Sequence, residues 1–437
     1  MLGAASAKHT LRRAKHTLST SADAFPVFPT FFLLGFGLLL PWNVIVNCIP
    51  AFQASLGASR YAFLAPLAFN SPQLPVQLLQ LCLGERLPPA HRLYAGFALQ
   101  AALLALLPFA LPLGLAPVLA GCALSGAATA ALESALFGAA GQLGGEAGAV
   151  GVRAILVGEG AAALLASLVQ LGLHADPALG ASAWAVRAYF LAACVFMLGC
   201  LALLPRLGAG GGGSGDGGGG ASEDAEASLE MVLLPLNGEG EGAKPPASNL
   251  TLLALLARVW PTALAIFLAM FFSFLVFPGA LTEIAYTGGS EDFFSRDPTA
   301  WALLLFFLFQ LGDLSGRWVA GLPCIGGGCT GVNTARARVL AIVAYNAARA
   351  AFLPLFYVAS RPGGAGRVPG GPAALAAAVL AFGVSNGHAA TLAMVAGAQL
   401  VEARHSQQAS TLHVLFLIAG LWAGAAGGLL FAPPLSN

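Results

Sequence analysis

Eleven apolar runs of about 20 residues follow one another along this chain of 437 residues. Each is long enough to cross a bilayer as an α-helix. The chain is 58% hydrophobic and 9% charged, whereas soluble proteins carry roughly a quarter charged residues. This pattern predicts an all-α integral membrane protein. The expected spans are Phe25–Cys48, Tyr61–Leu83, Leu93–Leu113, Pro117–Gln142, Val150–Leu173, Ala183–Leu204, Val259–Thr282, Ala300–Pro323, Val339–Ser360, Pro372–Val401 and Ala409–Ala432.

A glycine-rich and acidic segment divides these spans into a group of six and a group of five. Residues 208–247 begin with a near-continuous glycine tract and continue with Glu and Asp, a composition that cannot bury a core. We therefore expect an N-terminal tail at 1–24, a six-helix bundle at 25–204, a disordered loop at 205–257 and a five-helix bundle at 258–437.

The distribution of Lys and Arg orients the spans. If the N-terminus is cytoplasmic, fourteen Lys and Arg residues lie on the cytoplasmic side and five outside, as the positive-inside rule requires. An odd number of spans then leaves the C-terminus extracellular. The N-terminal tail repeats the basic motif AKHTL at 7–11 and 14–18. We expect a cytoplasmic tail and a plasma-membrane protein, while an organellar transit peptide and an organellar membrane stay open.

Several functional classes are not expected from this sequence. A net charge of +1 provides no electrostatic basis for nucleic-acid binding. An enzyme is not expected, because the metalloprotease motif HExxH is absent and Asp313 is the only clear intramembrane aspartate. Neither a cofactor nor a metal is expected, since Cys324 and Cys329 have no second pair and no neighbouring His. A channel or receptor remains an alternative that saturable uptake with counterflow would separate from a carrier.

Polar residues inside the first span indicate a helix face that avoids lipid. The run GLLLPWNVIVN contains Pro41, Trp42, Asn43 and Asn47. Asn43 and Asn47 are four residues apart and share one helical face, beside Trp42. Pro41 removes a backbone donor, which is tolerated where other helices or water satisfy the freed carbonyl. We expect this face to line a polar cavity between helices.

Ionisable residues inside a span are functional hypotheses, because their desolvation must be compensated. Asp313 and Arg317 are four residues apart and can form an ion pair on one helix face. Glu133 and Glu159 have no cation nearby in the sequence. A buried carboxyl of this kind is protonated part of the time, which suits a hydrogen-bonding group, a proton carrier or a cation attractor. Arg349 is expected to anchor packing or a gate.

Four motifs in four spans resemble those of one transporter family. The first span holds PWN, the eighth FQLGDLSGR, the ninth RAAFLPLF and the tenth SNGHAATLAM. With the eleven spans and the long loop after the sixth, they resemble the equilibrative nucleoside transporters (solute carrier family 29 type). The residues that carry the motifs are Pro41, Trp42, Asn43, Gln310, Asp313, Gly316, Arg317, Arg349, Pro354, Ser385, Asn386 and Gly387.

This resemblance implies a fold of the major facilitator type, in which bundles of six and five helices rock about a central site. It implies transport of nucleosides by alternating access, with free nucleobases and proton coupling left open. In that family the Trp of PWN lines the nucleoside site, and the eighth-span Asp and Arg contact the ribose. These roles pass to Trp42, Asp313 and Arg317.

The remaining candidate residues complete the expected site. We expect Asn43 and Glu133 to contact substrate as well. A structural or gating role is expected for Pro41, Asn47, Gln310, Arg349, Ser385 and Asn386.

Three positions depart from the family pattern. Glu133 and Glu159 stand where the family commonly has glutamine, and Gln310 stands where it has asparagine. A branch of the same family carries organic cations and has an acid in the fifth helix. Glu159 and Glu133 therefore keep an organic cation or monoamine open as the alternative substrate.

Overall fold

The computed structural model describes residues 27–83, 89–143, 145–176, 179, 182–209, 251–321, 335–401 and 403–433. Within these ranges the regular secondary structure is helical, and ten helical stretches are long and apolar enough to cross a membrane. The predicted all-α, multi-pass membrane protein is confirmed. The N-terminal tail, most of the glycine-rich loop and the Cys324 and Cys329 segment lie outside the described residues.

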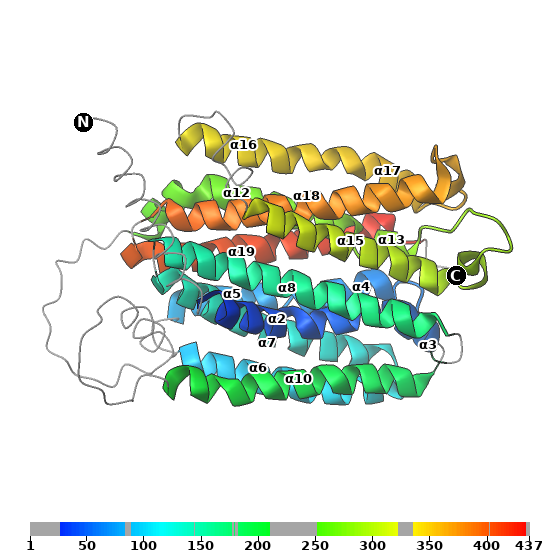
Figure 1. Cartoon of the computed structure of the whole chain (residues 1–437), viewed down its shortest axis with the longest axis horizontal. Helices are drawn as coiled ribbons and strands as arrows, with labels where there is room; N and C mark the ends of the chain where they lie inside the picture. The colour runs from blue at the N-terminus through cyan, green and yellow to red at the C-terminus, as the bar shows by residue number, and fades with distance from the viewer. Residues whose placement is uncertain are drawn as a thin grey trace, which may run out of the picture.

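The long helices lie side by side and run roughly parallel to one axis of the molecule (Figure 1). Helices α6 and α10 form one edge of this view, and α16 and α17 form the opposite edge. The N-terminal half contains α2 (Val27–Asn47), α3 (Ile49–Leu56), α4 (Tyr61–Asn70), α5 (Gln73–Leu83), α6 (Pro89–Ala110), η2 (Leu111–Leu113), α7 (Leu115–Leu143), α8 (Gly145–His174) and α10 (Ala183–Ala209).

The C-terminal half begins after the glycine-rich loop. It contains α12 (Leu252–Val276), α13 (Gly279–Thr282), α14 (Phe293–Arg296), α15 (Pro298–Ala320), α16 (Ala335–Ala348), η3 (Arg349–Phe352), α17 (Leu353–Ala359), η4 (Ala365–Arg367), α18 (Gly371–Gln399), α19 (Ala403–Gly428) and η5 (Leu429–Phe431).

The second predicted span, 61–83, is two helices rather than one. Helix α4 ends at Asn70 and α5 begins at Gln73, because Pro72 has no N–H to continue the hydrogen-bond ladder. Side chains near the break bond the carbonyls of the preceding turn: Asn70 donates to Pro66 at 2.7 Å and Ser71 to Leu67 at 2.7 Å. Each part alone is too short to cross a membrane, so ten long spans are found where eleven were predicted.

The ends of the predicted central loop also differ. Helix α10 continues to Ala209 and α12 begins at Leu252, so both helices extend into the range predicted as loop, 205–257. Helix α12 begins there because Thr251 is its N-cap, with the side chain accepting a hydrogen bond from the backbone N–H of Ala254 at 3.3 Å.

Glycines let the helices around the site approach closely. On α15, a Cβ at Gly312 or Gly316 would collide with the backbone of α18. On α18, a Cβ at Gly383 or Gly387 would collide with carbonyl oxygens of α15. This reciprocal seam of small residues sets α15 and α18 in backbone contact, and it fixes the positions of Asp313 and Asn386 relative to each other.

Two glycines of the last long helix, α19, behave in the same way. A Cβ at Gly420 or Gly424 on α19 would collide with the carbonyls of Phe267 or Phe271 on α12. These two glycines set α19 and α12 in close backbone contact.

Candidate functional site

A cavity of about 90 Å³ lies between the two halves of the chain. Helices α2, α4, α5, α7 and α8 contribute to it from the N-terminal half, and α12, α15, α18 and α19 from the C-terminal half. The lining residues are Leu39, Trp42, Asn43, Phe69, Asn70, Gln73, Thr129, Glu133, Leu156, Glu159, Ala163, Ile266, Met270, Ser273, Phe274, Phe277, Phe309, Gln310, Asp313, Arg317, Asn386, Ala390, Leu417 and Leu421.

Aromatic rings form part of the lining. Trp42 stacks on Phe69 with ring centroids 4.3 Å apart, and Phe274 of the other half lies 6.3 Å from Trp42 at an interplanar angle of 22°. Phe277 and Phe309 stack 4.7 Å apart. Because flat conjugated rings stack favourably on such surfaces, the cavity suits a planar aromatic group.

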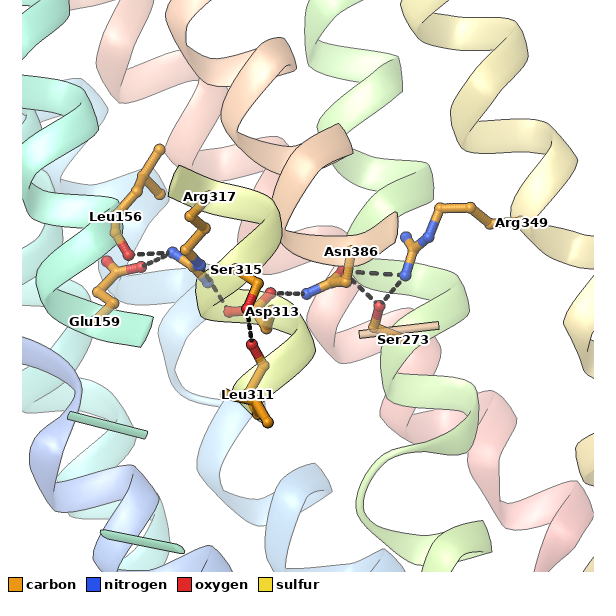
Figure 2. A network of polar contacts seen from close by, with 9 residues as sticks. All are labelled: Leu156, Glu159, Ser273, Leu311, Asp313, Ser315, Arg317, Arg349 and Asn386. Atoms are coloured by element: carbon orange, nitrogen blue, oxygen red, sulfur yellow. Dashed lines mark hydrogen bonds and ion pairs between the residues drawn. The ribbon is translucent and has the colours of Figure 1, made fainter. Parts of the chain in front are cut away.

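Arg317 joins three groups from the two halves (Figure 2). Its Nε donates to Asp313 Oδ2 at 2.7 Å, so the ion pair predicted from the four-residue spacing is present. Its Nη1 donates to Glu159 Oε2 at 3.0 Å and to the backbone carbonyl of Leu156 at 2.7 Å, both on α8. The sequence showed no cation near Glu159, and the tertiary structure provides one.

The second carboxylate oxygen of Asp313 accepts a hydrogen bond from a residue of α18. Asn386 Nδ2 donates to Asp313 Oδ1 at 2.7 Å. The Asn386 carbonyl oxygen accepts from Ser273 Oγ at 2.6 Å and from Arg349 Nη2 at 3.1 Å, so the amide can present only its NH₂ group to Asp313. Figure 2 shows this chain of contacts running from Arg349 to Glu159.

Arg349 lies outside the cavity lining and is 2% exposed. Its Nη1 donates to the Ala269 carbonyl at 2.7 Å and its Nε to Ser385 Oγ at 3.1 Å. The guanidinium also lies 5.0 Å from the ring centroid of Phe382. These contacts bind Arg349 to α12 and α18 and place Ser385 beside Arg349 rather than in the cavity.

Glu133 is the cavity carboxyl without a cationic partner. Apart from histidine, the buried acidic and basic side chains of the described residues are Glu133, Glu159, Asp313, Arg317 and Arg349. Two guanidinium groups thus accompany three carboxyl groups, and both are engaged in the network of Figure 2. Within the described part of the chain, no hydrogen bond or ion pair is made by Glu133. Glu133 therefore carries the excess negative charge of the site when it is ionised.

The polar residues of the first span divide between the cavity and the helix interior. Asn43 lines the cavity and donates to the Leu39 carbonyl at 2.9 Å. Asn47 donates to the Asn43 carbonyl at 2.8 Å and does not line the cavity. Pro41 lies inside α2 and is buried. Gln310 lines the cavity, and its amide makes no hydrogen bond to another described residue.

Several lining residues were not identified from the sequence. Asn70 and Gln73 flank the break between α4 and α5, and the Asn-Ser-Pro-Gln run there was a readable signal for a polar interruption. Thr129 lies one helical turn before Glu133 on α7. Ser273 and Phe274 lie in an apolar run with no marker that distinguishes them from packing residues.

Polar contacts join the two halves on both sides of the cavity. Beyond one end of the α8 residues that line it, Arg153 donates to the Gly321 carbonyl at 3.1 Å. Beyond the other end, His174 Nδ1 lies 3.2 Å from Asp297 Oδ2. On this second side Arg60 also donates twice to the Pro433 carbonyl, at 2.7 and 3.0 Å. The site is thus a central chamber between two sets of contacts that connect the halves.

Across the residues that the structure describes, no group of three or more His, Cys, Asp or Glu side chains could hold a metal ion. The polar centre is instead built from paired carboxylates, guanidiniums and amides, which suit hydrogen bonding to a neutral or cationic organic solute.

Residues 222–432 match a family model described as "Nucleoside transporter". The family resemblance is confirmed over these residues. They contain three of the four motifs that carried it, in α15, in the α16–α17 segment and in α18. A search of curated proteins returned no match.

Solved transporter structures share the fold. The human organic anion transporter MFSD10 (TETRAN) is 16% identical with a TM-score of 0.54, and the match covers 94% of each chain. The proton:xylose symporter XylE, bound to 6-bromo-6-deoxy-D-glucose, is 12% identical with a TM-score of 0.57. That match covers 94% of this chain and 95% of the other. XylE belongs to the major facilitator superfamily, so the predicted major-facilitator-like architecture is confirmed. Family and fold together support a membrane transporter.

Proposed function

We propose that this protein transports nucleosides across a membrane by alternating access. The observation that carries the proposal is the pairing, in one central cavity, of stacked aromatic rings with the Asp313–Arg317 ion pair. A nucleoside has the matching two ends, a flat base and a ribose rich in hydroxyl groups.

Each part of the cavity has a role in this proposal. The base packs beside Trp42 and Phe274, whose rings come from different halves of the chain. The ribose hydroxyls bond the remaining lone pairs of Asp313 and the unused N–H groups of Arg317. Glu133, Asn43 and Gln310 bond the base edge. Free nucleobases would use the same base contacts but lose those to Asp313 and Arg317.

The contacts between the halves support alternating access. A solute enters when the Arg60–Pro433 and His174–Asp297 contacts open, and it leaves when the Arg153–Gly321 contact opens. The site residues then exchange exposure between the two faces of the membrane. We propose a plasma-membrane location with the N-terminus cytoplasmic and the C-terminus extracellular, which antibody accessibility of terminal epitope tags in intact cells would test.

The test is a radiolabelled uptake panel in cells that lack endogenous nucleoside uptake, run at two pH values. We expect saturable uptake of purine or pyrimidine nucleosides and acceleration by unlabelled nucleoside on the opposite side. Such counterflow separates a carrier from a channel. Absence of uptake for every nucleoside and nucleobase, with the protein present in the membrane, would exclude the proposal.

An organic cation is the second candidate substrate, and the unpartnered Glu133 carboxyl favours it. With three carboxyls against two guanidiniums, a cationic solute would neutralise the excess charge of the site. Glu159 is less available, because Arg317 already occupies one of its oxygens. If a monoamine blocks uptake while adenosine and uridine do not, the cation assignment replaces the nucleoside assignment.

A further inference from the structure

Six polar residues line the N-terminal side of the cavity, and four of them keep an oxygen acceptor but no free donor hydrogen when the carboxyls are ionised. We call Gln73, Thr129, Glu133 and Glu159 the acceptor wall. They come from α5, α7 and α8. The hydrogen bonds that these residues already make leave only acceptors available to a solute.

Gln73 uses both amide hydrogens within its own segment. Its Nε2 donates to the Phe69 carbonyl at 3.2 Å and to Asn70 Oδ1 at 3.0 Å. A backbone carbonyl can only accept, so the orientation of the amide is fixed by chemistry. The group left for a solute is the Gln73 carbonyl oxygen.

Thr129 is committed in the same way by a buried network. Its hydroxyl donates to the Ser125 carbonyl at 3.0 Å and accepts from Gln100 Nε2 at 2.8 Å. Gln100 is itself fixed, since Ser125 Oγ donates to its Oε1 at 2.7 Å. The remaining capacity of the Thr129 hydroxyl is one lone pair, which is an acceptor.

The two glutamates complete the acceptor wall. Glu159 Oε2 accepts from Arg317, which leaves Oε1. Glu133 has neither oxygen bonded by another described residue, and it interacts electrostatically with Glu159. An ionised carboxylate has acceptors and no donor. Free donors lie across the cavity on α15, where Arg317 Nη2 and the Gln310 amide have no partner among the described side chains.

We propose that Glu133 is a specificity-determining residue that selects nucleosides whose base presents two adjacent N–H donors, as guanine does. This inference rests on the proposed nucleoside transport. A ring N–H beside an exocyclic amino group bonds both carboxylate oxygens in parallel. Hypoxanthine has a C–H group in place of the amino group, so the second carboxylate oxygen loses its hydrogen bond and stays unpaired.

Guanosine and inosine differ only in this amino group, so they form the matched pair for the test. Initial uptake rates of each labelled nucleoside would be measured for the full chain in proteoliposomes, in slightly alkaline buffer that favours ionised carboxylates. We expect kcat/KM for guanosine to exceed that for inosine about tenfold, the lower range for one good bidentate contact. Glu133→Gln replaces one acceptor with a donor, and we expect it to bring the ratio to near one.

The control is Glu146→Gln, because Glu146 is exposed at the start of α8 and outside the cavity; it should keep the wild-type ratio. Equal kcat/KM values for the two nucleosides in the wild-type protein overturn the inference without any variant. An unchanged ratio in an active Glu133→Gln protein overturns it too. Both results are compatible with nucleoside transport. If the protein takes up no nucleoside or nucleobase of the panel, the proposed function itself is excluded.

Discussion

Arg317 Nη1 lies 3.0 Å from Glu159 Oε2, and this ion pair connects the C-terminal half of the chain to the N-terminal half beside the cavity. Both side chains are 8% exposed. Alternating access requires the halves to move relative to each other, so a buried charge contact between them must shift or break during the cycle. A change at the Arg317–Glu159 pair, which lines the cavity, would therefore accompany a change in how the two halves pack against each other.

Removal of the Glu159 carboxylate should destabilise the protein. Glu159→Ala leaves the buried Arg317 with one counter-charge fewer, and loss of one partner of a buried pair costs about 3–5 kcal/mol. We expect the thermal unfolding midpoint in detergent, followed by size-exclusion chromatography after heating, to fall by several degrees. Glu159→Gln keeps an oxygen acceptor and should have an intermediate effect.

The matched control is the Arg296–Glu291 pair, whose side chains are 68% and 93% exposed. Such surface pairs contribute about 0–1 kcal/mol, so Glu291→Ala should leave the midpoint nearly unchanged. Equal shifts for Glu159→Ala and Glu291→Ala would contradict a stabilising contact between the halves.

Asn386 should act on transport through Asp313. Asn386→Ala removes the hydrogen bond to Asp313 Oδ1, and bonds to charged groups contribute about 1.5–3 kcal/mol. We expect uptake, normalised to the amount of protein in the membrane, to fall about tenfold or more. Asn386→Asp should be worse, because it sets a second carboxylate against the first.

Asn346 provides the comparison for Asn386. It is also a fully buried asparagine, but its amide donates to the Ile342 carbonyl of its own helix and it does not line the cavity. Asn346→Ala should retain most of the uptake. If both alanine variants lose uptake equally, the effect of Asn386 is one of general packing.

Trp42 and Trp422 offer a direct test of the aromatic wall. Trp42 is 3% exposed, lines the cavity and stacks on Phe69, whereas Trp422 is 40% exposed on α19. We expect Trp42→Ala to reduce uptake far more than Trp422→Ala, and Trp42→Phe to recover part of the loss by keeping an aromatic face. Equal effects of the two alanine variants would exclude a stacking role.

Proton coupling of uptake should depend on Glu133. The ionisable groups that share the cavity with Glu133 are Glu159, Asp313 and Arg317, and Arg317 donates to both of these carboxyl groups. In proteoliposomes we expect an inward proton gradient to accelerate uptake by the wild type and to have no effect on Glu133→Gln. A wild type that ignores the gradient, with Glu133→Gln uptake unchanged, is a purely facilitative carrier.

The sequence by itself determined the membrane class, the approximate spans and the identity of the central ion pair. Hydrophobic length sets where a helix can cross a bilayer, and a four-residue spacing places Asp313 and Arg317 on one face whatever surrounds them. The third and fourth spans are also separated by a local feature, because Gly114 between them adopts a φ of +97°. The helix break at Pro72 also has a local cause, but the apolar residues on both sides of Pro72 led to the prediction of one continuous span.

Only the tertiary structure decided which charges are compensated. Glu159 and Arg317 are 158 residues apart, so no helical periodicity could pair them or show that Glu133 has no such partner. The same holds for Asn386, whose amide is oriented by Ser273 and Arg349 from two other helices. Periodicity acts over a few turns of one helix, whereas the polarity of the cavity arises where the glycine seams bring distant helices into backbone contact.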